Sequence, residues 1–161
     1  MQIHTIQPIY NRDSKILILG TFPSIKSREE SFFYAHPQNR FWKVLALVFE
    51  QSLPNSIEEK TEFLLKNKIA LWDVISSCDI VGSSDSSIKN VKVNDIGKIL
   101  KIADIQKIFV NGNKAYQLYR KYIEPEFNIS AVCLPSTSPA NARYNLEKLL
   151  EDWQKIKIGK L

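Results

Sequence analysis

The feature that most limits how this chain can fold is a short, uninterrupted apolar run at residues 16–19, followed directly by Gly20-Thr21-Phe22-Pro23-Ser24. A strand made only of apolar residues is typical of a parallel sheet with both faces covered. The glycine and proline after it predict a loop at the strand's carboxyl end. Open α/β sheets bind their ligands at that edge, so we expect the functional site there.

Alternating strands and helices follow along the rest of the chain. Further strands are predicted at residues 69–74, 108–110 and 129–134, and helices at 39–49, 57–67, 94–101, 114–122 and 145–156. Residues 83–90 are polar and turn-rich, which predicts an exposed loop. This order of elements is typical of an α/β fold with three α/β/α layers around a central, mostly parallel four-stranded sheet. We expect a single domain over residues 1–161.

Charge and cysteine content narrow the function classes. The chain has 22 Lys and Arg against 17 Asp and Glu, a net charge of +5, which suits a polyanionic partner without requiring one. Its two cysteines, Cys78 and Cys133, are too few for an iron–sulfur cluster, and neither histidine completes a usual zinc spacing with them. We therefore expect no metal and no cofactor. Because the sequence shows neither a signal peptide nor an apolar run long enough for a membrane span, we expect a reduced, cytoplasmic protein.

The loop at residues 20–24 is not a nucleotide-phosphate loop. It lacks the Gly-Lys-Ser/Thr ending of such loops and the spaced glycines of a dinucleotide fingerprint, so ATP and NAD are not favoured. The chain also has no Gly-x-Ser-x-Gly elbow and no Ser/His/Asp order. An enzyme with this sequence would work mainly by positioning and electrostatics.

Polar and aromatic side chains near the predicted strand ends are candidate ligand contacts, and each also has an ordinary structural role. Asp73 ends a strand, where its carboxylate could accept a hydrogen bond from a ligand N–H or cap a turn. Tyr34 could stack on a base, whereas the adjacent Phe32 and Phe33 favour a core role. Asn39 lies at the predicted start of a helix, where it could be only an N-cap.

A second polar loop lies between Pro135 and Pro139 and just beyond. Its hydroxyls and amides, from Ser136, Ser138 and Asn141, could grip a phosphate backbone or could simply form a turn. Arg143 close by is an ordinary surface cation unless something anionic binds near it.

Read together, these segments resemble the uracil-DNA glycosylase superfamily, and within it the branch of DNA-deoxyinosine (hypoxanthine) glycosylases. Three motifs carry the resemblance: the loop at residues 20–24, the run Tyr34-Ala35-His36-Pro37-Gln38-Asn39-Arg40-Phe41-Trp42-Lys43-Val44, and the loop at residues 134–141. The long central run is similar to mismatch-specific uracil glycosylases and is the most specific of the three.

The resemblance implies roles for the matching residues. The first loop, with Gly20, Thr21 and Phe22, would cup a flipped nucleotide. An aromatic ring at Tyr34 would stack on the base, and Asp73 would read its edge. The loop at 134–141 would enter the duplex. The residues expected at the DNA are Ser24, Ser138, Ala140, Asn141 and Arg143.

The chain departs from the family pattern at three positions. Phe22 stands where many members carry a polar residue that positions water, and by resemblance Asn39 takes over that catalytic role. Ser136 stands where the classical uracil enzymes carry a histidine, so electrophilic help would come from its hydroxyl or from backbone amides. Ala140 replaces the leucine wedge, which implies weaker insertion and a preference for pairs that are already destabilised.

The function implied by this resemblance is base-excision repair of DNA that contains deaminated bases. The enzyme would be a monofunctional N-glycosylase that removes hypoxanthine, acting as a monomer. One alternative is a uracil or mismatch-specific glycosylase of the same fold. An alternative of another class is a binder of modified nucleobases or DNA, in which Tyr34 and Asp73 recognise a base but no water is positioned.

Overall fold

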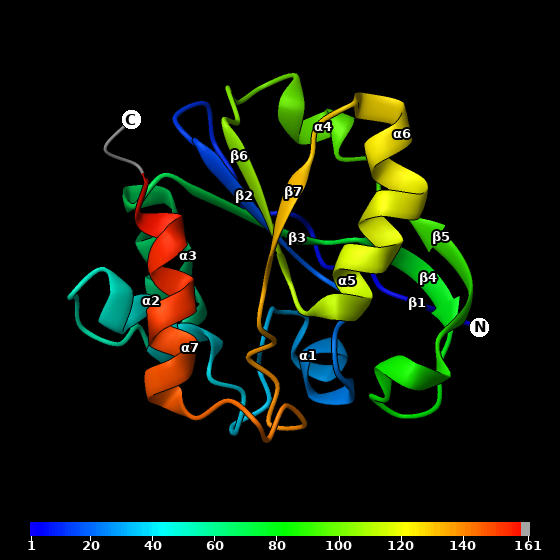
Figure 1. Ribbon diagram of the computed structural model, residues 1–161, viewed down its shortest axis with the longest axis horizontal. Helices are drawn as coiled ribbons and strands as arrows, with labels where there is room; N and C mark the ends of the chain where they lie inside the picture. Colours follow the sequence, from blue (N-terminus) through cyan, green and yellow to red (C-terminus); the bar gives the residue numbers. More distant parts are fainter. Residues whose placement is uncertain (159–161) are drawn as a thin grey trace.

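The structure is a computed structural model that describes residues 1–158 (Figure 1). Its central sheet has four parallel strands in the order β3-β2-β6-β7, in agreement with the sequence-based expectation. The strands are β2 (Ile16–Gly20), β3 (Ile69–Asp73), β6 (Lys107–Asn111) and β7 (Ala131–Leu134). Gly20 pairs with Asp73, and Asn111 pairs with Leu134. Because all four strands run the same way, these terminal residues meet at one edge of the sheet.

Helices cover both faces of this sheet, which confirms the three-layer α/β/α fold (Figure 1). One face carries α2 (Phe41–Val48), α3 (Ile57–Lys66) and α7 (Leu146–Trp153). The other face carries α5 (Asn113–Leu118), a π-helical turn (Tyr119–Ile123) and α6 (Glu124–Phe127). Short elements complete the chain: α1 (Ile25–Glu30), α4 (Gly97–Leu100) and 3-10 turns at Asp85–Ser87 and Gln154–Ile158. The helix expected over 94–101 is thus only the four residues of α4.

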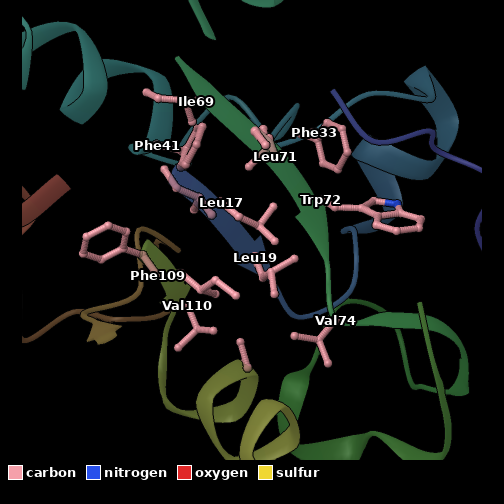
Figure 2. Packing of buried hydrophobic residues seen from close by; sticks show 14 of the residues in the cluster. Leu17, Leu19, Phe33, Phe41, Ile69, Leu71, Trp72, Val74, Phe109 and Val110 are labelled. Carbon is pink, nitrogen blue, oxygen red and sulfur yellow. The ribbon is translucent and has the colours of Figure 1, made fainter. Parts of the chain in front are cut away.

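The apolar run that predicted the first strand forms the centre of the core. Every residue of β2 is buried, and Figure 2 shows Leu17 and Leu19 among side chains of β3 and β6. On the helical side, the ring of Trp153 is fully buried and meets Phe41 edge-on, with ring centroids 5.8 Å apart. Each such side chain contributes about 1.5–3 kcal/mol by leaving water, so the sheet edge rests on a rigid base.

A second, antiparallel sheet was not predicted. It consists of β1 (Gln2–Ile3), β4 (Ile75–Asp79) and β5 (Lys89–Val93), in the order β1-β4-β5. The exposed loop predicted over 83–90 is wrong at its end, because β5 begins at Lys89. The residues of β5 are polar and partly exposed, so this strand contains no apolar run from which it could be predicted.

The two sheets join at a sharp turn that fixes the position of Asp73. Only Val74 separates β3 from β4, and its N–H donates to the Gly20 carbonyl at 2.8 Å. The Asn94 amide donates to the carbonyls of Asp73 and Ile75, at 2.9 and 3.3 Å. The backbone of Asp73 is therefore held from both sides. None of the helices in residues 1–158 combines the length and the apolar character needed to cross a membrane.

Candidate active site

A cavity of about 1050 Å³ opens at the edge where the four parallel strands end. Its walls are the loops after β2, β6 and β7, the end of β3 at Asp73, the connection between β4 and β5, and the segment between α1 and α2. In Figure 1 these loops gather below the sheet, next to α1. All twelve site residues expected from the sequence line this cavity: Gly20, Thr21, Phe22, Ser24, Tyr34, Asn39, Asp73, Ser136, Ser138, Ala140, Asn141 and Arg143.

Three of these residues, Gly20, Asp73 and Tyr34, meet at the strand ends and form the floor of the cavity. A Cβ atom added to Gly20 would lie 2.5 Å from Asp73 Oδ1 and 2.7 Å from the Tyr34 hydroxyl. Contacts that short are not tolerated, so only glycine leaves room for both polar atoms. The glycine after the first strand is therefore required by the site and not only by the turn.

The Asp73 carboxyl group is buried without a hydrogen-bond partner. Its residue is 4% exposed, and no partner within residues 1–158 bonds to Oδ2. Burial, followed by the negative charge of Asp85, raises the pKa of Asp73 to about 7. An orphaned polar atom in such a position is costly unless a ligand satisfies it.

His4 lies close to Asp73 but does not neutralise it. The distance from His4 Nε2 to Asp73 Oδ2 is 3.8 Å. Nε2 donates instead to the Ile75 carbonyl at 2.7 Å, and Nδ1 accepts the Ile6 N–H at 3.3 Å. These two bonds define a neutral imidazole, and burial is the main cause that lowers the pKa of His4.

Tyr34 is held rigidly in an unusual backbone conformation. Its φ angle is +52°, which is uncommon for a residue with a side chain. One face of its ring stacks on Phe41, with ring centroids 3.9 Å apart and the planes 18° from parallel. Its hydroxyl accepts a hydrogen bond from Asn111 Nδ2 at 3.1 Å. Burial raises the pKa of this phenol, followed by the charge of Asp73, so it stays neutral.

A chain of buried polar groups links Tyr34 to Asn39. Asn111 Nδ2 also donates to the Thr137 hydroxyl at 3.0 Å, while Asn111 Oδ1 accepts the Thr137 N–H at 3.0 Å. Thr137 in turn donates to Asn39 Oδ1 at 2.9 Å. The same Asn39 oxygen accepts the Phe41 N–H at 2.9 Å. The N-cap of α2 is Arg40 and not Asn39, although Asn39 Oδ1 bonds to the first N–H of the helix. The Asn39 NH₂ group remains available as a donor.

Arg40 fastens the second polar loop to the start of α2. Its guanidinium group donates to the carbonyls of Ser138 at 2.8 Å, Asn141 at 3.3 Å and Tyr144. Its backbone N–H donates to the Thr137 carbonyl at 3.1 Å. The fixed fork of an arginine side chain suits several carbonyls at once. The loop at residues 137–144 is thus held in one conformation.

The remaining predicted residues lie on the walls and rim. Ser136 Oγ accepts the Ser138 N–H at 3.1 Å, which leaves the Ser136 hydroxyl proton free. Ala140 and Arg143 are exposed at the rim, whereas Asn141 is partly buried and bonds to the Ser136 carbonyl. Ser24 caps α1, with its hydroxyl accepting the Ser27 N–H at 3.1 Å.

Two backbone donors of the first loop are unused. The hydrogen bonds of the described chain include none from the N–H of Thr21 or of Phe22. The Phe22 ring points away from solvent and meets His4 edge-on, with centroids 5.3 Å apart. Phe22 thus offers its backbone N–H to a ligand but no polar side chain.

Sequence reasoning missed several residues of the site. Thr137, Asn111, Arg40 and Asp85 were not singled out, although each lines the cavity or holds a residue that does. Asn111 and Thr137 had a signal in the sequence, since both stand at or just after a predicted strand end. Asp85 had none. Within residues 1–158 no three His, Cys, Asp or Glu residues are grouped closely enough to hold a metal ion.

The fold and the cavity define a class of protein: a parallel α/β domain whose strand-edge pocket presents one carboxyl group, one aromatic ring and amide donors to a flat polar ligand. Comparison with known proteins gives the family. The model of the uracil DNA glycosylase superfamily matches residues 7–158, and the chain belongs to that superfamily.

Two curated relatives and one solved structure are similar to this chain. A hypoxanthine DNA glycosylase of Methanosarcina acetivorans is 30% identical over 152 residues, which is 92% of this chain and 93% of the relative. A hypoxanthine DNA glycosylase of Methanosarcina barkeri is 31% identical over 110 residues, 67% of this chain and 70% of the relative. A solution NMR structure from Methanosarcina acetivorans, described provisionally as a uracil DNA glycosylase, superposes with a TM-score of 0.79 at 26% identity. That match covers 96% of this chain and 98% of the other.

Proposed function

We propose that this protein is a DNA glycosylase of base-excision repair that flips a deaminated nucleotide out of DNA and hydrolyses its N-glycosidic bond, with hypoxanthine as the preferred base. Membership of the superfamily and two relatives named hypoxanthine DNA glycosylases support the reaction and the base. The observation that carries the proposal is the buried, unpartnered Asp73 carboxyl group in a cavity wide enough for a nucleotide.

Asp73 is suited to the lactam edge of hypoxanthine. That edge presents N1–H as a donor beside O6 as an acceptor. A carboxyl group with a pKa of about 7 is populated in both forms near neutral pH. The ionised form accepts from N1–H, and the neutral form also donates to O6. The unused N–H groups of Thr21 and Phe22 supply further donors for O6 or N7.

Tyr34 provides the flat surface for the base. Phe41 already covers one face of its ring, so the other face is the one left for stacking. A base stacked on an aromatic side chain gains ~1–3 kcal/mol. The bonded hydroxyl and the stacked Phe41 fix the ring before the base arrives, which reduces the ordering cost of binding.

Asn39 and Ser136 act on the leaving base. As the C1′–N9 bond breaks, negative charge develops on the base, and fixed donors stabilise it. The Asn39 NH₂ group is such a donor, because its oxygen is already bonded twice. The free hydroxyl proton of Ser136 is a second. Because Asn39 and Ser136 stabilise the leaving base and neither bonds covalently to the sugar, we expect hydrolysis by water without a covalent lysine intermediate.

The rim contacts the DNA backbone and duplex. Ser24, Ser138, Asn141 and Arg143 are the polar residues there, and the net charge of +5 favours a polyanion. Ala140 stands at the wedge position, so flipping relies on a lesion that already pairs weakly. We further propose that the chain acts as a single-domain, cytoplasmic monomer without metal or cofactor; activity that survives EDTA and a monomeric mass in solution would support those points.

The test is a single-turnover base-release assay on duplexes with one deoxyinosine or one deoxyuridine, comparing wild type with Asn39→Ala. The exposed Asn55→Ala serves as the matched control. We expect hypoxanthine release that falls at least ~10-fold in Asn39→Ala only. Preferred uracil release would favour the uracil or mismatch-specific alternative, and DNA binding without any release would favour the non-catalytic binder. A borohydride-trapped adduct would contradict simple hydrolysis.

A further inference from the structure

The connection between β4 and β5 forms part of the cavity wall, although it belongs to the second sheet. It is anchored to α1 by two hydrogen bonds: Ser83 Oγ accepts the Ile25 N–H at 3.0 Å, and Arg28 Nη2 donates to the Gly82 carbonyl at 2.8 Å. In Figure 1 this connection lies beside α1, at the carboxyl edge of the parallel sheet. A polar segment outside the three family-like motifs is thereby fixed next to the site.

Asp85 is the charged residue that this connection brings to the cavity. The side chain of Thr21, in the loop after β2, is near enough to lower the pKa of Asp85. Burial is the main cause that raises the pKa of Asp73 and of Tyr34, and the negative charge of Asp85 adds to the rise in both. Asp85 is itself an exposed residue, so its carboxylate lies on the open side of the cavity, within electrostatic reach of Asp73 and Tyr34.

None of the three family-like motifs contains a carboxylate that could accept a proton from water. Phe22 supplies an apolar ring, and Asn39 Oδ1 already accepts two hydrogen bonds. Ser136 Oγ already accepts the Ser138 N–H. Asp152, which also lines the cavity, lies on α7 and is not among the charges that affect Asp73 or Tyr34. Asp85 supplies at this cavity the carboxylate that the three motifs lack.

We propose that Asp85 is the carboxylate that holds the attacking water and faces the positive charge that develops on the sugar. This inference rests on the proposed glycosylase activity. The C1′–N9 bond breaks and its electron pair leaves with the base. The water oxygen forms the new bond to C1′, and Asp85 takes the water proton. The base anion then takes one proton from solvent, and Asp85 returns its proton to solvent, so one water is consumed per base released.

The surroundings of Asp85 and Asp73 give the two carboxyl groups different tasks. Burial is the main cause that raises the pKa of Asp85, whereas the positive charge of Lys114 and the side chain of Thr21 oppose that rise. Asp73 has no cation among the causes of its own shift, and His4 beside it is neutral. Lys114 and Thr21 favour the charged form of Asp85, and no such group favours the charged form of Asp73, so Asp85 suits the sugar and Asp73 suits the base.

The experiment compares wild type, Asp85→Asn and Asp104→Asn in single-turnover release from a deoxyinosine duplex, with duplex affinity measured by fluorescence anisotropy. Asp104 is a matched control because its side chain is 79% exposed and pairs with Lys15, at 3.9 Å. We expect Asp85→Asn to lower the release rate by ~10²-fold or more, as for a lost proton acceptor, with the duplex Kd changed less than ~3-fold. Asp104→Asn should match wild type.

A pH profile separates a catalytic role from a structural one. The wild-type release rate should fall on the acid side as Asp85 and Asp73 take up protons. Asp85→Asn should lose the part that is due to Asp85 and keep only the titration of Asp73, while its Tm stays unchanged. Asp85→Asn at the wild-type rate, or slowed with an unchanged acid limb, would overturn the role of Asp85 and leave the proposed function intact. A wild type that releases neither hypoxanthine nor uracil would overturn the proposed function and this inference with it.

Discussion

The Thr137 hydroxyl donates to Asn39 Oδ1 at 2.9 Å, across 98 positions of sequence. This bond joins the loop after β7 to the segment before α2, the two places where the sequence suggested catalytic residues. It also fixes the orientation of the Asn39 amide, because the oxygen faces Thr137 and the Phe41 N–H. The NH₂ end makes no hydrogen bond within the described residues, so the amide is free to donate to a ligand.

Replacing Asn39 by aspartate tests that orientation. Asn39→Asp keeps the oxygen that Thr137 and Phe41 use but exchanges the NH₂ donor for a second acceptor. Hypoxanthine release should fall by at least ~10-fold, as after removal of a fixed donor near a developing anion. Single-turnover kinetics on a deoxyinosine duplex give the answer. A rate equal to or above that of wild type would mean that the residue accepts a proton from water.

Removing the Thr137 hydroxyl should affect both stability and rate. Thr137→Val leaves Asn111 and Asn39 each short of one buried partner. The free energy of unfolding should fall by about 1–3 kcal/mol, the cost of such groups. Base release should slow by ~10-fold, since the Asn39 amide is no longer held in place. Urea unfolding and single-turnover release measure the two effects.

Thr61→Val is the matched control for that substitution. The Thr61 hydroxyl also donates a hydrogen bond, to the Ile57 carbonyl at 2.8 Å, but on the exposed side of α3. This variant should keep the wild-type release rate. Equal effects of the two substitutions on release would contradict a role for the buried polar chain.

A methyl group at Gly20 should block the floor of the cavity. In Gly20→Ala the new Cβ would approach Asp73 Oδ1 to 2.5 Å and the Tyr34 hydroxyl to 2.7 Å. Overpacking of this kind costs about 1–3 kcal/mol of stability. We expect a folded protein whose hypoxanthine release is slowed by ~10²-fold or more, because the displaced groups are those that hold the base. Circular dichroism with the release assay checks this, and wild-type release would show that the base lies elsewhere.

The parallel sheet could be predicted because its information is local. The apolar run at residues 16–19 and the capping pattern of helix α3 can each be recognised within a few residues of sequence. The predicted cap is present, because the Ser56 hydroxyl accepts the Glu59 N–H at 3.0 Å. Gly20 and Asp73 were placed at strand ends for the same reason. Parallel topology then brought them together without any further signal.

The rest of the site depends on contacts that sequence patterns do not encode. Asp85 is one acidic residue in a serine-rich segment, and only the pairing of β4 with β5 brings that segment to the cavity. Arg40 lies within the most specific motif, yet its partners are backbone carbonyls about 100 positions away. The His4–Asp73 approach likewise requires β1 to pair with β4.

Arg40 should be needed to keep the second loop in place. Arg40→Lys preserves the charge but has no planar fork to bond the carbonyls of Ser138 and Asn141 together. Amide hydrogen exchange at residues 136–144 should quicken by ~10-fold or more, and the duplex Kd should rise. Arg12→Lys, at an exposed position, is the control. Unchanged exchange in Arg40→Lys would show that the loop is rigid without this anchor.

The free energy of unfolding should depend on pH because of the ionisation of Asp73. Its pKa of about 7 lies above the ordinary 3.8, so the folded state holds a proton that the unfolded state has lost between those values. The contribution of this group to stability is therefore complete below about pH 4 and is lost as pH rises through 7. Asp73→Asn removes the dependence, so the variant should gain stability relative to wild type between pH 5 and pH 8, by up to roughly 4 kcal/mol over the full range.

Urea unfolding of wild type, Asp73→Asn and Asp104→Asn at the two pH values measures this difference. Asp104 is largely exposed, so its variant should track wild type at both. The neutral state of His4 leaves it unable to cancel the effect by forming an ion pair with Asp73. A stability gap between wild type and Asp73→Asn that is the same at pH 5 and pH 8 would mean that Asp73 is ionised throughout. The carboxyl group could then only accept, and the N1–H of the base would be its sole partner.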